Sequence, residues 1–156
     1  MPNFKLYSLK IFLLIILFLL ACNQKNNLRH YQIQVIPDSV VFGRNKAVIL
    51  AIKNMKAADV INQLENDTSI KISYNLEVTN NNPIKGSYVF VNPSNFRLVL
   101  DNHHKLTHAF YNSMGTDPQS TTISTGNIFD LPAKTKPVAL DLFFADSVIR
   151  IKILLH

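Results

Sequence analysis

The chain has 156 residues, a formal net charge of +6 and one cysteine. One cysteine cannot close a disulfide within the chain, so a core in a chain of this length, about one domain, must be held together by packing. The basic residues are dispersed, with no Lys/Arg cluster longer than a pair, which argues against nucleic acid as a partner.

The first residues have the pattern of an export signal. Lys5 and Lys10 give a positively charged start, and an unbroken apolar run follows over residues 11–20. The span 11–21 has only 11 residues, whereas a membrane-spanning helix needs about 20 apolar residues. The pattern therefore predicts a signal peptide over residues 1–21 that is removed from the mature protein.

The end of the apolar run, Leu19-Leu20-Ala21-Cys22, resembles the lipobox of bacterial lipoproteins. The resemblance implies cleavage before Cys22, a diacylglyceryl group on its thiol and an acylated new amino terminus. Two alternatives stay open, an ordinary secreted protein and a retained N-terminal anchor, and all three place the remainder outside the cytoplasm. Asn23 follows Cys22, and the absence of Asp at that position resembles the outer-membrane sorting signal of enteric bacteria. We therefore expect a protein anchored to a bacterial membrane by lipid on Cys22, to the outer rather than the inner membrane, through a polar tether over residues 22–28.

The rest of the chain, residues 29–156, is dominated by alternation of apolar and polar residues. The alternation is clearest over 70–79, where every apolar residue is followed by a polar one, as in a half-buried antiparallel strand. Many short strands separated by turn formers predict an all-β domain, an antiparallel β-sandwich. The other expected strands cover residues 31–36, 47–53, 88–91, 96–100, 106–111, 121–125, 138–144 and 148–154.

One segment, residues 55–66, departs from this alternation. Ala57, Val60, Ile61 and Leu64 fall at helical spacing, and the segment is rich in helix-forming residue types. We expect one short helix near 55–66, with an irregular strand as the alternative.

Two stretches of the domain resemble a family of uncharacterised immunoglobulin-like domains found in bacterial lipoproteins and secreted proteins. They are Leu76-Glu77-Val78-Thr79-Asn80-Asn81-Asn82 and Val91-Asn92-Pro93-Ser94-Asn95-Phe96-Arg97-Leu98. In that family a strand ending in a V-T-N-N turn is followed by a P-S-x-F-x-L strand, a polar hairpin and a late turn. The resemblance implies an immunoglobulin-like sandwich outside the cytoplasm, and it implies no reaction.

Three histidines, His103, His104 and His108, are the candidate metal ligands, because imidazole is a common ligand for metal ions. On a strand the Cα atoms of His104 and His108 would be about 13 Å apart, too far for two ligands of one ion. Solvated turn histidines are the favoured interpretation, and a small-ligand or metal-binding envelope protein is the alternative function. No metal and no cofactor is predicted.

The sequence offers no catalytic constellation. No serine lies in a Gly-x-Ser-x-Gly motif, and the one thiol is expected to carry lipid. Asp141 and Asp146 could pair, but we expect them to solvate the outer face of a sheet. The chain is therefore predicted not to be an enzyme.

Aromatic residues fall mostly at strand spacing, so the core is expected to take them first, Tyr88 and Phe90 included. Adjacent aromatic pairs cannot both point inward, and the pairs Phe110-Tyr111 and Phe143-Phe144 are each expected to present one ring for partner contact. The apolar segment 148–155 would invite β-augmentation if it lay at a sheet edge. We expect a non-enzymatic module that binds another envelope protein.

Overall fold

The structure is a computed structural model that describes residues 29–43, 45–62 and 67–156. The expected signal peptide, the lipobox with Cys22 and the tether lie outside the described residues. Within the described ranges, no helix is long and apolar enough to cross a membrane.

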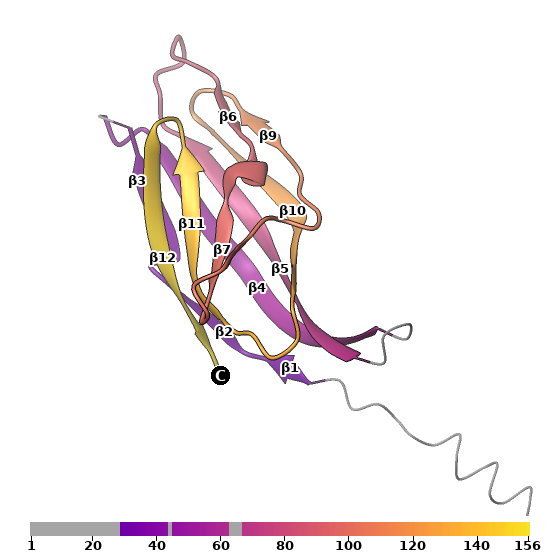
Figure 1. Cartoon of the computed structure of the whole chain (residues 1–156). Coiled ribbons are helices and arrows are strands. Elements are labelled where there is room, and N and C mark those ends of the chain that lie inside the picture. The colour runs from indigo at the N-terminus through magenta and orange to yellow at the C-terminus, as the bar shows by residue number, and fades with distance from the viewer. Residues whose placement is uncertain (1–28, 44, 63–66) are drawn as a thin grey trace, which may run out of the picture.

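The described chain is built almost entirely from antiparallel strands (Figure 1). One short 3₁₀ turn, η1 (Pro93–Asn95), interrupts them. The strands are β1 (His30–Tyr31), β2 (Ile33–Ile36), β3 (Ser39–Phe42), β4 (Val48–Asn62), β5 (Asp67–Asn80), β6 (Val89–Val91), β7 (Arg97–Leu100), β8 (Lys105–Leu106), β9 (Met114–Thr116), β10 (Ser120–Leu131), β11 (Pro137–Phe144) and β12 (Ser147–Leu155).

Two sheets face each other, and a separate small ribbon lies at one end of them. The first sheet has the order β1-β4-β5-β10, with β3 also paired to β4, and the second has the order β2-β12-β11-β7-β8. The ribbon consists of β6 and β9. The predicted fold class, an all-β antiparallel sandwich, is confirmed.

The core lies between the two sheets because each contributes the apolar half of its alternating strands. In β5, Ile72, Tyr74, Leu76 and Val78 are buried, while the residues between them point outward and are partly exposed. The second sheet presents buried aliphatic side chains from β7, β11 and β12 to the same layer. These are Leu98, Leu100, Leu140, Leu142, Ile151 and Ile153.

The expectation of a short helix near residues 55–66 is wrong. Residues 55–62 continue β4 and pair with β5 as far as Asn62, and residues 63–66 lie outside the described chain. A β-bulge between Lys53 and Lys56 precedes the residues at helical spacing. Leu50 and Ile52 point inward before it and Met55 and Ala57 after it, so the bulge shifts the period-two pattern by one residue.

One further strand expectation also needs correction. Residues 106–111 do not form a strand, since β8 ends at Leu106 and only a single bridge joins Phe110 to Ile128. In the C-terminal strand β12, residues 147–152 pair with β11 and residues 152–155 pair with β2. Each part of β12 is thus paired on one side, and β-augmentation at this strand stays a prediction.

Candidate functional site

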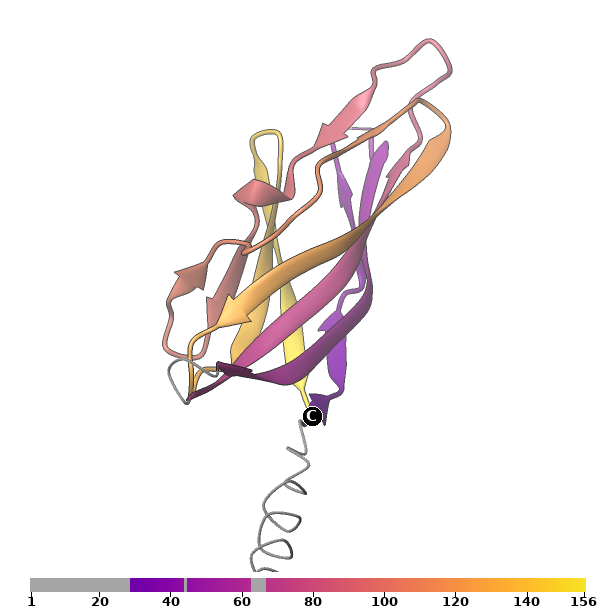
Figure 2. The ribbon, with the colours of Figure 1, turned by 90° about the vertical axis from the view of Figure 1, so that its right-hand side faces the viewer.

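The segment between β8 and β9, residues 107–113, crosses one open side of the sandwich and runs along β10 (Figures 1 and 2). Its backbone is tied to that strand: the Ala109 amide donates to the Ile128 carbonyl at 2.9 Å. The Asn112 side-chain amide donates to the Thr125 carbonyl at 2.8 Å, and its backbone amide donates to Asn127 Oδ1 at 3.2 Å. These bonds cover much of the β10 edge, which would otherwise be free to pair.

Four aromatic side chains are exposed along this side of the molecule, and we call them the aromatic stripe. Tyr88 and Phe90, from the ribbon, are each 58 % exposed, and Phe110 and Tyr111, from the crossing segment, are 52 % and 41 % exposed. The ribbon pair lies beside Thr122 of β10, whose hydroxyl donates to the Gly115 carbonyl, and Phe110 lies beside Ile128 of the same strand. Thr122 and Ile128 are about 20 Å apart along β10, so the stripe follows the edge of the sandwich.

One of the exposed rings is seated against a glycine. A Cβ at Gly115 would lie 2.1 Å from Cζ of Tyr88, so the phenol ring occupies the space that any side chain there would need. A Cβ at Gly126, where φ is +75°, would lie 4.0 Å from Cε1 of Phe110, which is an ordinary contact distance. The Tyr88 ring is therefore held close to the ribbon backbone, which limits the rotamer entropy that it would lose on contact with a partner.

Beneath the stripe, His108 lies in a cluster of aromatic rings. Its ring stacks on Phe129 with centroids 3.9 Å apart and meets Tyr111 edge-on at 6.1 Å. Its Nε2 is 2.7 Å from the hydroxyl of Tyr74, a residue of the core of β5. Burial raises the pKa of that hydroxyl well above its ordinary value, so Tyr74 stays protonated. His108 thus connects an exposed ring of the stripe to the core.

Burial also lowers the pKa of His108 from 6.5 to about 4. The Pro93 carbonyl opposes this decrease and the charge of Arg97 adds to it. The Pro93 carbonyl is close enough to affect the pKa but does not meet the geometry of a hydrogen bond, and buried Nδ1 has no partner in the described chain. The imidazole is therefore neutral at physiological pH and fills the cluster as a ring.

The three candidate metal ligands do not come together as one site. His103, with φ +67°, and His104 are exposed in the turn between β7 and β8, whereas His108 has its Nε2 bonded to Tyr74. In the described ranges no group of three or more His, Cys, Asp or Glu side chains could hold a metal ion.

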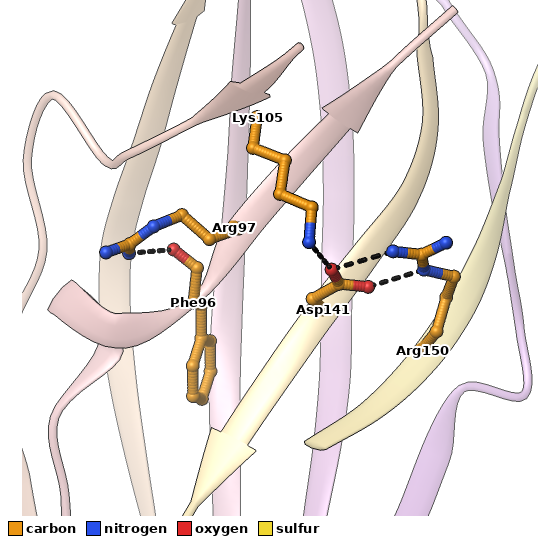
Figure 3. A network of polar contacts seen from close by, with 5 residues as sticks. All are labelled: Phe96, Arg97, Lys105, Asp141 and Arg150. Atoms are coloured by element: carbon orange, nitrogen blue, oxygen red, sulfur yellow. Dashed lines mark hydrogen bonds and ion pairs between the residues drawn. The ribbon is translucent and has the colours of Figure 1, made fainter. Parts of the chain in front are cut away.

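A buried carboxylate lies on the opposite face of the second sheet from the core. Figure 3 shows Asp141 between Arg150, whose Nε and guanidinium NH₂ donate at 2.6 and 2.9 Å, and Lys105, whose Nζ donates at 3.0 Å. Arg97 turns away and donates to the Phe96 carbonyl at 2.8 Å. The side chain of Asp141 is only 3 % exposed, so the expectation that it solvates the outer face is wrong. The hydrogen bond from Arg150 lowers the pKa of the carboxyl group, Lys105 adds to this, and burial opposes it.

The second aromatic pair is less exposed than the first. Phe143 and Phe144 are both half-buried and pack against the core, and Phe144 meets Phe42 edge-on with centroids 5.7 Å apart. Phe110 and Tyr111 remain available for partner contact.

Tyr88 and Phe90 were expected in the core, and that expectation is wrong. The signal was in the sequence: they alternate with Val89 and Val91, which are buried, so the two aromatic rings must point to the other side of the ribbon.

No protein-family model, curated protein or solved structure matches the chain. The geometry and chemistry of the described residues are therefore the basis for inferring a function.

Replacing Asp141 by Asn should destabilise the protein, because the cationic side chains of Lys105 and Arg150 would then face a neutral amide. We expect the free energy of unfolding at neutral pH to fall by about 2 kcal/mol. This is near the low end for charged hydrogen bonds, because both cationic side chains are half-exposed. The pKa of folded Asp141 lies below its ordinary value of 3.8, so the difference should persist above pH 3.8 and disappear as the pH falls through the folded pKa. Urea titrations at several pH values measure this. Asp146→Asn, in the exposed turn after β11, is the matched control, and an equal loss in both variants would contradict the assignment.

His108 should make stability depend on pH in a defined window. Below pH 6.5 the unfolded chain takes up a proton that the folded chain resists until about pH 4, so this contribution is complete above 6.5 and is lost as the pH falls towards 4. In His108→Phe, which keeps a ring in the cluster, the slope of melting temperature against pH should become smaller across this window. Exposed His104→Gln should leave the slope unchanged. An unaltered slope in His108→Phe would show that another group causes the pH dependence.

Proposed function

We propose that the chain is a non-enzymatic envelope lipoprotein, anchored through lipid on Cys22, whose sandwich binds another envelope protein through the aromatic stripe. The observation that carries the proposal is the exposure of Tyr88, Phe90, Phe110 and Tyr111 along one edge of the fold. Large exposed apolar groups mark interaction surfaces in soluble domains, and two pairs about 20 Å apart along one edge can be covered by a single protein interface of ordinary size.

The surroundings of the stripe favour a protein partner. Tyr and Phe are enriched in protein interfaces, where they bury large areas at low entropic cost. The crossing segment supplies uncharged polar neighbours, Asn112 and Ser113, which are bonded within the molecule. Aromatic anchors with a polar rim have the composition of a protein–protein contact rather than of an enzyme cleft.

The placement of the stripe relative to the proposed anchor is also favourable. Figure 1 shows β6 and β9 at the opposite end of the sandwich from β1, where the described chain begins. Residues 23–28 separate Cys22 from the domain, and a fully extended tether would reach about 20 Å. Anchored in this way, the ribbon end of the stripe would project away from the membrane.

The anchor can be tested by metabolic labelling of cells with an alkyne analogue of palmitate. The full-length protein should carry the label, and its mature amino terminus should be Cys22. Cys22→Ser should lose the label, whereas Leu20→Ala, which keeps the cysteine and a small-residue context, should retain it. A wild-type protein that carries no label, or that begins at another residue, would rule out the lipoprotein assignment.

The partner surface can be tested by cross-linking in intact cells, with adducts identified by mass spectrometry. We expect Phe90→Ser combined with Phe110→Ser to reduce the main protein adduct about tenfold, as loss of a hot spot worth about 1.4 kcal/mol would. The matched control is Val41→Ser combined with Ile123→Ser. It removes two apolar side chains, 45 % and 54 % exposed, from the first sheet. An adduct that survives the stripe variant, or is lost equally in the control, contradicts the proposal.

A further inference from the structure

A pocket of about 420 Å³ opens at the end of the sandwich where the described chain begins. Arg29 and Tyr31 at the start of the domain, Asp59 of β4, and Lys134 and Lys136 between β10 and β11 line it. Figures 1 and 2 show β1 and the chain between β10 and β11 at this same end. Three cationic side chains therefore face one carboxylate in a space large enough for a small ligand.

The carboxylate of Asp59 is already used inside the wall of the pocket. The Tyr31 hydroxyl donates to Oδ1 at 2.8 Å, and the Arg29 backbone amide donates to Oδ2 at 3.2 Å. The hydrogen bond to Asp59 raises the pKa of Tyr31. Asp59 thus holds the first residues of the domain in place, and its charge is partly compensated by two donors.

The two lysines are held on a fixed turn and carry no ion pair. Lys134 has φ +63°, and after it the amide and hydroxyl of Thr135 both donate to the Pro132 carbonyl, at 3.3 and 2.7 Å. The Lys136 amide donates to Asp101 Oδ1 at 3.2 Å. Within the described ranges, the ion pairs involve Lys71, Lys105 and Arg150 and neither of these two lysines. Their ammonium groups are free to bind an added anion.

We propose that this pocket binds a phosphate group, and specifically the phosphodiester headgroup of an anionic lipid in the membrane that carries the anchor. A guanidinium and two ammonium groups suit phosphate oxygens, to which Arg can donate in a bidentate manner. The membrane source rests on the proposed lipid anchor at Cys22, because the tether limits this end of the domain to about 20 Å from the bilayer. Basic groups so close to an anionic surface are attracted to it. The contact would fix the orientation of the sandwich on the membrane.

The test uses the full-length protein in nanodiscs of phosphatidylcholine with or without phosphatidylglycerol. Amine acylation of each lysine is followed by mass spectrometry. Lys134 and Lys136 should react about fivefold more slowly when phosphatidylglycerol is present. Lys46 and Lys85, near the opposite end, should not change, and neither should Lys71, which is near the pocket but outside its lining. Equal protection of Lys71 would indicate general closeness to the bilayer and would overturn the proposal.

Two further experiments test whether the phosphate comes from lipid and whether the two lysines bind it. If only glycerol phosphate, added to discs of phosphatidylcholine alone, protects the lysines, the phosphate site stands but the lipid source is overturned. If neither phosphatidylglycerol nor glycerol phosphate protects them, the phosphate site and the lipid source are both overturned. In a Lys134→Gln, Lys136→Gln variant, protection of Arg29 from phenylglyoxal by phosphatidylglycerol should be lost. A Lys46→Gln, Lys85→Gln variant should keep it. Glycerol phosphate can be tested without lipidation and the variants leave the aromatic stripe intact, so failure here is distinguishable from failure of the proposed function.

Discussion

The structure depends on one apolar layer shared by two sheets that no disulfide can join, since the chain has one cysteine. Burial of apolar side chains must therefore supply the cohesion. Tyr74 and Leu76 from the first sheet face the layer that Leu98 and Leu140 from the second also enter. The bulge in β4 lets Leu50 and Ile52 before it and Met55 and Ala57 after it all enter this layer, and the segment over β10 closes one side of the layer.

Sequence patterns were sufficient for most of this architecture where alternation is regular. The expected strand at 70–79 lies inside β5, and that at 138–144 differs from β11 by one residue. Alternation failed in β4, because the bulge between Lys53 and Lys56 changes which residues face the core, and beyond it Ala57, Val60 and Ile61 have a spacing that a helix also produces. It also failed at residues 106–111, where the backbone hydrogen bonds of Ala109 and Phe110 to β10 all involve Ile128, so no continuous ladder forms.

The candidate site was only partly predictable, because its parts come from distant positions. A local rule about adjacent rings predicted that one ring of the Phe110-Tyr111 pair would be exposed, whereas both are exposed. The environment of His108 did not, since its partner Tyr74 is 34 residues away, nor did that of Asp141, whose partner Lys105 is 36 residues away. Burial of a polar group depends on partners that tertiary folding supplies, and a single sequence gives no sign of which residues those are.

The seating of Tyr88 on Gly115 has a consequence for how this surface could change in evolution. Only four glycines occur in the chain, and Gly115 is the one whose missing side chain makes room for the Tyr88 ring. Even an alanine there would displace the phenol while leaving every aromatic residue of the stripe in the sequence. Mutational tolerance at this position should therefore follow selection on the surface, although the glycine itself presents no side chain to a partner.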